Sequence, residues 1–254
     1  MRSISPLALE VLGERARPVT SAEERVLAVP SPLASLLPGA VLRRGSVVAV
    51  ATPGGPVDGR DDAAASLALG LVSAASAEGS WCALVGAPGL GLAAAAELGL
   101  ALDRLPVVAA PPPTGSRSWA WVVATLLDGL DAVVAWPPLQ LSSADARRLR
   151  DRARRRSAVL VIVGPWPGPV DLRLEVVGVE WEGVGAGAGR LRRRRVALRA
   201  GGRAWAGREP LAEAWLPADG GGLAACEASS SAAVDRGRGA GPGGAAGDRE
   251  RRVG

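Results

Sequence analysis

A glycine-rich loop connects an apolar segment to a helix-forming segment in the first quarter of the chain. The apolar segment at 47–51 predicts a buried strand, and the alanine- and leucine-rich segment at 63–77 predicts a helix. Gly54, Gly55 and Gly59 lie in the loop between them. A loop of this kind holds phosphate in many proteins, because the backbone amides of the helix N-terminus point at the ligand. The sequence therefore predicts the outline of an anion site here.

The loop lacks the cation that a nucleotide requires. All 30 cationic residues of the chain are arginine, whereas a phosphate loop uses a lysine to neutralise the β and γ phosphates. Asp61 and Asp62 stand at the start of the predicted helix instead. A carboxylate there can cap the free amides of the first turn, occupy the anion position and repel a triphosphate. We expect a capped helix rather than a nucleotide site.

Composition excludes further kinds of catalytic site. The chain has 254 residues and no histidine, so neither a Ser-His-Asp triad nor a Cys-His dyad can form. Without lysine there is no Schiff base, and Cys82 and Cys226 are too few for a zinc site built on thiolates. We expect no catalytic residue, no metal site and no cofactor. The net charge of +5 favours an anionic partner such as nucleic acid, but an arginine-rich surface explains it equally.

Strand-like and helix-like segments alternate from residue 36 to residue 216, which predicts an α/β fold with a mainly parallel sheet covered on both faces. The predicted strands are residues 46–51, 81–85, 105–108, 132–135 and 159–163, and the predicted helices are residues 63–77, 92–98, 119–127 and 143–156. Ser118 and either Ser142 or Ser143 are the expected caps of the last two helices. Segments 172–181 and 192–200 predict an antiparallel hairpin at the sheet edge.

The chain divides into three expected regions: a helical or loose segment over residues 1–30, an α/β domain over residues 31–217, and a tail over residues 218–254. The tail is rich in glycine, alanine and charge, which predicts disorder. No apolar stretch is long enough to span a membrane, and the N-terminus becomes charged too early for a secretory signal. Together with the low cysteine content, this favours the cytoplasm.

Four segments carry a resemblance to a known family. They read LLPGAVLRRGSVVAVA, SLALGLVSAASAEGSWCALVG, AAELGLALDRLPVV and DGLDAVVAW. Their order resembles the core of the RecA recombinase, and it is most similar to the shortened, degenerate RecA relatives of the actinobacterial mutagenic translesion-repair system, the ImuA type. The resemblance covers residues 33–200 and implies a RecA-like (P-loop NTPase-type) fold.

The resemblance also locates three positions at which RecA-like ATPases carry chemistry. Anchored on Ser66, it places Ala64 where the phosphate-loop lysine stands. Gly86 follows the second strand where these ATPases have a catalytic glutamate, and Trp136 ends the strand that carries the magnesium-linked aspartate. Because all three groups are replaced, we expect a pseudo-ATPase with a degenerate phosphate loop that does not bind magnesium-ATP at millimolar concentration.

The resemblance implies a role in DNA repair and the SOS response to DNA damage. The chain would act in translesion synthesis as a non-catalytic adaptor for a Y-family-like polymerase subunit (the ImuB type), together with an error-prone replicative-type polymerase. RecA and single-stranded DNA are further candidate partners. Two alternatives stay open: a DNA-dependent RecA-like ATPase or recombinase, and a single-stranded DNA-binding protein.

Candidate contacts with a partner or DNA lie in two arginine-rich segments and a tryptophan pair. They are Arg154, Arg155, Arg156, Arg192, Arg193, Arg194, Arg195, Trp119 and Trp121. The first group ends a helix, where arginine also suits the dipole. The second begins a strand expected at the sheet edge, where charge either prevents edge-to-edge aggregation or contacts phosphate. The two tryptophans lie two positions apart on a helix, so at least one must face away from the core and can anchor a partner.

Overall fold

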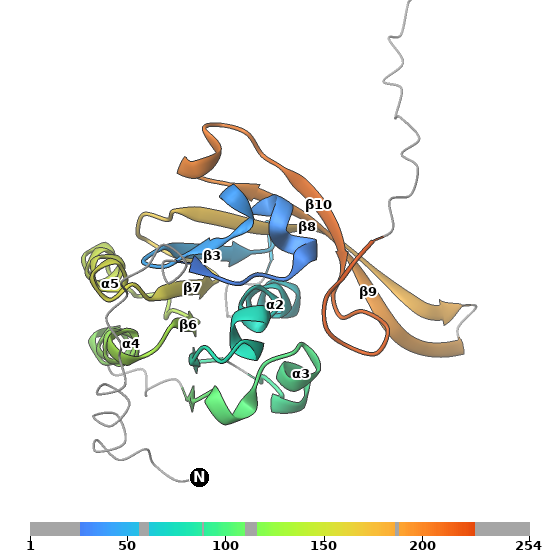
Figure 1. Cartoon of the computed structure of the whole chain (residues 1–254), viewed down its shortest axis with the longest axis horizontal. Coiled ribbons are helices and arrows are strands. Elements are labelled where there is room, and N and C mark those ends of the chain that lie inside the picture. Colours follow the sequence, from blue (N-terminus) through green and yellow to red (C-terminus); the bar gives the residue numbers. More distant parts are fainter. Residues whose placement is uncertain (1–25, 56–60, 88, 110–115, 186–187, 227–254) are drawn as a thin grey trace, which may run out of the picture.

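Helices cover both faces of a large mixed sheet in the computed structural model (Figure 1), which describes residues 26–55, 61–87, 89–109, 116–185 and 188–226. The strands are β1 (Val26–Leu27), β2 (Leu42–Arg43), β3 (Val47–Ala51), β4 (Cys82–Val85), β5 (Val107–Val108), β6 (Ala132–Ala135), β7 (Val159–Val163), β8 (Leu172–Gly185), β9 (Ala188–Gly201), β10 (Leu211–Trp215) and β11 (Ala224–Ala225). The helices are α2 (Asp62–Ala77), α3 (Leu92–Glu97), α4 (Ser116–Gly129) and α5 (Ser143–Arg156), with short 3-10 segments η2 (Ser31–Leu36), η3 (Pro38–Ala40), η4 (Leu102–Arg104) and η5 (Arg203–Trp205).

The main sheet has nine strands in the order β11-β10-β9-β8-β3-β7-β6-β4-β5. The strands from β8 to β5 in this order run parallel, whereas β9, β10 and β11 each pair with their neighbours in antiparallel fashion. A separate sheet pairs β1 with β2. The α/β class, the mainly parallel sheet and the antiparallel C-terminal hairpin predicted from the sequence are therefore confirmed.

Two apolar layers hold the helices on the sheet. One layer joins α2 and α3 to one face, and the other joins α4 and α5 to the opposite face. Every residue of β4, β6 and β7 is buried, which is why these strands read as continuous apolar runs without alternation. The end of β3 and the start of α2 lie at the carboxyl ends of the parallel strands.

Two predicted helix starts can be compared with the structure. Helix α5 has the predicted bounds, and the Ser142 hydroxyl accepts a hydrogen bond from the backbone nitrogen of Asp145 at 3.1 Å, as a capping residue does. Helix α4 begins at Ser116, so Ser118 lies inside the helix and the prediction that it is the cap is wrong. The helix begins one turn earlier than its apolar residues indicated.

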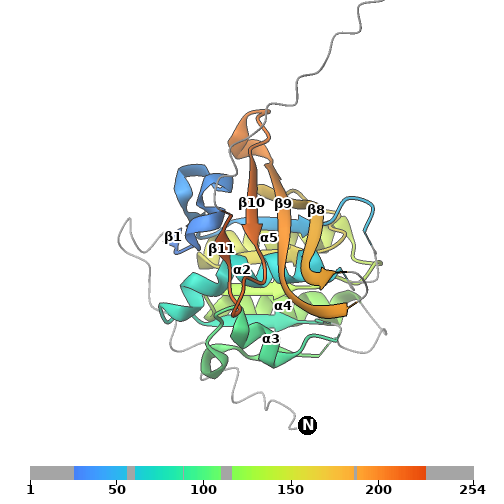
Figure 2. The ribbon, with the colours of Figure 1, turned by 90° about the vertical axis from the view of Figure 1, so that its right-hand side faces the viewer.

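The predicted position of the hairpin at the sheet edge is wrong. Residues 172–175 of β8 pair with β3 in parallel fashion, and residues 195–199 of β9 pair with β10, so neither hairpin strand is an edge strand over these residues. Strand β10, which the sequence analysis did not predict, covers this part of β9. Each hairpin strand has 14 residues, and the far end of the hairpin projects beyond the helices (Figures 1 and 2). Only Arg194 and Arg195 of the arginine run pair with the segment of β10, so Arg190, Arg192 and Arg193 lie on the part of β9 that β10 does not cover.

The predicted terminal regions fall only partly within the described residues. The last part of the N-terminal segment forms β1, while residues 1–25 lie outside the described ranges. The predicted tail is structured as far as Cys226, because β11 pairs with β10. Residues 227–254 and 110–115 lie outside the described residues. Within the ranges described, no helix has both the length and the apolar character needed to cross a bilayer.

Candidate functional site

The side chain of Asp61 closes the N-terminus of α2. One carboxylate oxygen accepts hydrogen bonds from the backbone nitrogen of Ala64 at 3.0 Å and from the Thr52 hydroxyl at 2.9 Å. The other oxygen accepts from the backbone nitrogen of Thr52 at 2.9 Å. Asp61 is buried, while its neighbour Asp62 is exposed. The carboxylate therefore ties the end of β3 to the first turn of α2 and fills the position of an anion.

Gly54 and Gly55 let the described part of the loop pack tightly against this carboxylate. A Cβ atom added to Gly55 would lie 2.9 Å from the Thr52 carbonyl oxygen and 3.1 Å from an Asp61 carboxylate oxygen, so only glycine fits. Gly54 has a φ of 71°, a conformation that favours glycine. Gly59 belongs to residues 56–60, which lie outside the described ranges. The described part of the loop thus serves the internal carboxylate.

The side chains of Ala64 and Ser66 make their packing contact and hydrogen bond within the protein. Ala64 is fully buried in the apolar layer under α2, so a longer side chain at this position would have to displace core atoms. The Ser66 hydroxyl donates to the carbonyl oxygen of Asp62 at 2.7 Å, one turn earlier in the helix. Neither side chain points a free polar group at the loop.

The carboxyl ends of β4 and β6 carry a glycine and a buried indole. Gly86 follows β4 with a φ of 76°, and its backbone nitrogen donates to the Val108 carbonyl at 2.9 Å. Trp136 follows β6, is 6% exposed and packs in the apolar layer shared with α2. An indole therefore fills the space at the end of this strand, where the resemblance implied a magnesium-linked carboxylate.

Arg194 brings a buried positive charge from β9 toward the start of α2. It is 5% exposed, its Nε donates to the Leu216 carbonyl at 2.6 Å, and its guanidinium lies 5.2 Å from the Trp181 ring. Burial lowers the pKa of Arg194, and the negative charges of Asp62 and Asp61 act in the opposite direction. The acidic pair at the α2 N-terminus thus lies close enough to Arg194 for their charges to attract one another.

Arg193, Arg195 and Arg199 point to the opposite face of the sheet from Arg194, because successive side chains of a strand alternate. Ion pairs on that face join Arg193 to Glu182 at 2.8 Å, Arg195 to Glu213 at 2.7 Å and Arg199 to Glu175 at 2.6 Å. The hydrogen bonds that Arg195 donates to Glu213 and Arg199 donates to Glu175 raise the pKa of both arginines. Arg192 is exposed. Two arginines of the run at 190–195, Arg193 and Arg195, are therefore compensated by neighbouring glutamates, and together with the Arg199 pair they form a pattern called the ladder below.

Helix α4 places its two tryptophans on different sides. Trp119 is 3% exposed in the core, whereas Trp121 is 64% exposed. Trp121 lines a groove of about 440 Å³ between α4 and α5, called the Trp121 groove. The other residues that line it are Ala120, Ala124, Asp145, Arg148, Leu149, Arg152 and Arg155. The structure thus brings Trp121 together with part of the arginine cluster of α5.

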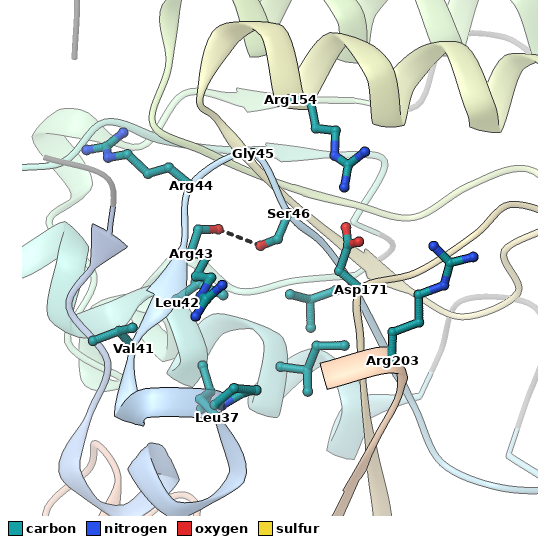
Figure 3. Close-up of a pocket in the computed structure, with 13 residues that line it drawn as sticks. Leu37, Val41, Leu42, Arg43, Arg44, Gly45, Ser46, Arg154, Asp171 and Arg203 are labelled. Atoms are coloured by element: carbon teal, nitrogen blue, oxygen red, sulfur yellow. Dashed lines mark hydrogen bonds between the residues drawn. The ribbon is translucent and has the colours of Figure 1, made fainter. Parts of the chain in front are cut away.

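The three arginines at the end of α5 differ in their surroundings. Arg155 lines the Trp121 groove and has no ion pair among the described residues. Arg156 pairs with Asp128 at 3.1 Å. Arg154 lines a separate pocket with Arg43, Arg44 and Arg203 (Figure 3). They therefore do not form one continuous patch.

The Cys82 thiol and the acidic side chains are the remaining candidates for a nucleophile and for metal ligands. Burial, with a smaller contribution from the charge of Asp131, raises the pKa of Cys82 to about 12, so its thiol stays protonated at neutral pH. Within the part of the chain that the structure describes, no three His, Cys, Asp or Glu side chains gather closely enough to hold a metal ion.

Sequence analysis missed several residues that shape these sites. Thr52, Arg43 and Arg203 were not singled out, and neither were the glutamates of the ladder. Thr52 and Asp61 are partners across the loop, which no local pattern indicates. The sequence did contain a pattern that predicts the ladder. Glu180 and Glu182 of β8 lie two residues apart, as do Arg193 and Arg195 of β9.

Comparison with known proteins places the chain in a family. The family profile described as the MT3502 N-terminal domain matches residues 35–168, which include the Asp61 cap and the Trp121 groove. The uncharacterized protein Rv3395c of Mycobacterium tuberculosis is 36% identical over 127 residues, covering 48% of this chain and 56% of that protein. The chain thus spans about half the length of this curated relative. Because the profile covers more than half of its residues, the chain belongs to the MT3502 N-terminal domain family.

Proposed function

We propose that the chain is a non-catalytic RecA-like accessory protein of DNA repair that acts by binding partners in translesion synthesis. Its expected main partner is a Y-family-like polymerase subunit of the ImuB type, working with an error-prone replicative-type polymerase. The proposal rests on the resemblance of residues 33–200 to ImuA-type proteins, and the order β3, loop, α2, β4 in a mainly parallel sheet is compatible with a RecA-like core.

The observation that carries the non-catalytic part is the Asp61 cap. The carboxylate accepts hydrogen bonds from the backbone amides of Ala64 and Thr52 and from the Thr52 hydroxyl. A phosphate bound in the loop would use donors of this kind. A triphosphate entering the loop would have to displace a buried negative charge. The rival proposal of a DNA-dependent ATPase or recombinase would also need a lysine, a glutamate and an aspartate where Ala64, Gly86 and Trp136 stand.

The Trp121 groove is the surface that best suits a protein partner. Tryptophan and arginine are enriched among the residues that dominate binding energy, and both line this groove. Trp121 is largely exposed, so its indole has apolar area that a partner can bury. Arg155, which forms no ion pair among the described residues, lines the same groove and favours a partner segment that carries carboxylates next to an apolar anchor.

A pull-down of the tagged chain from its host, with and without DNA damage, tests the proposal. Recovery of a Y-family-like polymerase in stoichiometric amount is the expected result. Trp121→Ala should reduce this recovery, while Leu139→Ala, which removes another exposed apolar side chain (63% exposed) that does not line the groove, should not. Failure to recover such a polymerase under either condition would contradict the adaptor role.

Direct binding of single-stranded DNA is the second candidate, favoured by the same groove. An exposed indole offers a stacking surface for a base, and Arg155 offers a phosphate contact. In the pull-down, this function would appear as recovery of the chain with nucleic acid but without the polymerase. Binding of a purified oligonucleotide that weakens steeply with salt would support it further.

A further inference from the structure

An arginine-lined pocket lies where β3 and β8 begin, at the opposite end of β3 from the Asp61 cap (Figure 3). Its volume is about 510 Å³, within the range of small-molecule sites. Apolar side chains form part of its wall, namely Leu37, Pro38, Val41, Leu42, Val48 and Leu172. Four arginines line it as well, Arg43, Arg44, Arg154 and Arg203, with Asp171 as the acidic residue. The pocket therefore combines an apolar wall with a cluster of positive charge.

Most of this positive charge is uncompensated. Arg44 is already paired with Asp131 at 2.7 Å. Asp171 is paired with Arg150 at 3.1 Å, and its other oxygen accepts from the backbone nitrogen of Val47 at 3.0 Å. Once these pairs are set aside, three guanidinium groups remain.

The three remaining arginines are Arg43, Arg154 and Arg203. All three are exposed, and none forms an ion pair within the described ranges. Figure 3 shows the side chains of Arg154 and Arg203 approaching Asp171 from two different elements. The pocket thus carries about three positive charges that a ligand can neutralise.

Close backbone contacts fix the positions of two of these arginines. A Cβ atom added to Gly45, which has a φ of +80°, would lie 3.3 Å from the Cα of Arg154, so the turn before β3 packs directly on the last turn of α5. A Cβ added to Gly202, with a φ of +123°, would lie 2.9 Å from the Asp171 carbonyl oxygen, and Arg203 is the next residue. The arginines therefore extend from backbone that is packed against the pocket wall, which lowers the entropy lost on binding.

We propose that this pocket binds a ligand with nucleotide chemistry, in which phosphate groups meet Arg43, Arg154 and Arg203 and the organic part lies on the apolar wall. Guanidinium groups bind phosphate through two parallel hydrogen bonds, which makes arginine the preferred partner of such groups. Three uncompensated charges match a polyphosphate or successive phosphodiesters better than a single carboxylate. The phosphates belong either to a free nucleotide or to a nucleic-acid strand. This inference is independent of the proposed adaptor function.

Calorimetry on the full chain tests the pocket with three probes: inorganic pyrophosphate, a deoxynucleoside triphosphate without magnesium, and a short single-stranded oligodeoxynucleotide. Saturable binding of any of them is the expected result. Tighter binding of the oligonucleotide than of the triphosphate identifies strand phosphates as the source, and the reverse order identifies a free nucleotide. Absence of saturable binding for all three probes overturns the proposal.

Matched double variants locate the binding. Arg154→Ala with Arg203→Ala should weaken the affinity by about tenfold or more, because charge-assisted hydrogen bonds are lost. The control, Arg147→Ala with Arg208→Ala, removes the same charge from exposed positions that do not line the pocket and should leave the affinity within about twofold of the unchanged chain. Arg154→Lys with Arg203→Lys keeps the charge and should give an intermediate affinity, because lysine lacks the planar fork. Equal losses in the pocket variant and the control would show that binding is not in this pocket.

Discussion

An oxygen of the Asp61 carboxylate lies 3.0 Å from the backbone nitrogen of Ala64, the residue that stands where the resemblance implies a phosphate-loop lysine. The same side chain also accepts hydrogen bonds from the backbone nitrogen and the hydroxyl of Thr52, which follows β3. The α2 N-terminus is therefore bound by an anion that belongs to the protein. This relationship explains how the loop can keep its shape without a nucleotide, and it leads to predictions on stability and binding.

Loss of the cap should destabilise the fold. Asp61→Ala removes three hydrogen bonds and leaves buried donors without partners, so the free energy of unfolding should fall by about 2 kcal/mol. Asp62→Ala is the matched control, since Asp62 is exposed in the same turn, caps no amide of the helix and contributes through the helix dipole and its attraction to Arg194, less than about 1 kcal/mol. Urea denaturation measures both. Equal effects of the two variants would show that Asp61 does not hold the loop.

The Cys82 thiol should make stability depend on pH above neutrality. Burial raises the pKa of Cys82 from 9.0 to about 12, so the folded protein keeps a proton that the unfolded chain releases. Stability is therefore full below about pH 9 and falls as the pH rises toward 12, with a slope of at most about 1.4 kcal/mol per pH unit.

The composition makes this measurement unusually clean, because the chain has no lysine or tyrosine to titrate in that range. Denaturation midpoints at several pH values between 9 and 11 should show the decline in the unchanged chain. Cys82→Ala should flatten the decline, while Cys226→Ala should largely preserve it. A decline that persists in Cys82→Ala would assign it to another group.

Substitution of one tryptophan of α4 should lower stability, and substitution of the other should weaken partner binding. Trp119→Ala empties a core position and should lower the free energy of unfolding by about 3–5 kcal/mol. Trp121→Ala changes an exposed side chain and should stay within about 0.5 kcal/mol of the unchanged chain while weakening capture of the partner. Thermal denaturation together with the pull-down distinguishes the two. Normal capture by Trp121→Ala would exclude the Trp121 groove as the docking surface.

The two arginine clusters should contribute differently to any binding of single-stranded DNA. Arg193 and Arg195 are held by the glutamates of the ladder, so Arg193→Ser with Arg195→Ser should change the salt dependence of affinity little. Arg154→Ser with Arg155→Ser removes two uncompensated charges and should reduce the slope of log affinity against log salt by about 1 or more. Fluorescence anisotropy at several salt concentrations provides both slopes. A flatter slope only in the β9 variant would reverse the assignment.

Sequence patterns predicted local elements well where one physical cause dominated. The bounds of α5 follow from Ser142 and the periodic apolar residues, and β7 follows from an uninterrupted apolar run. The acidic cap of α2 was also foreseeable as a choice between Asp61 and Asp62, although only the structure shows that Asp61 makes the contacts. Local propensity and burial pattern sufficed in these cases.

Long-range pairing could not be predicted in the same way. The position of residues 195–199 of β9 inside the sheet depends on β10, whose short segment Leu211–Trp215 is partly exposed and weakly patterned. The arginine-lined pocket joins residues from η3, α5 and η5, which only the folded chain brings together. Similarly, compensation of the β9 arginines depends on register with glutamates of β8 and β10.

The most direct test of the account is calorimetry with magnesium-ATP on the chain that carries Arg43→Ala, Arg154→Ala and Arg203→Ala, so that the pocket of Figure 3 lacks all three guanidinium groups proposed to bind phosphate. With the anion position of α2 filled by Asp61, the account predicts no saturable binding at millimolar ATP. Saturable, magnesium-dependent binding to this variant would contradict it, because a nucleotide would then occupy the loop despite the internal carboxylate.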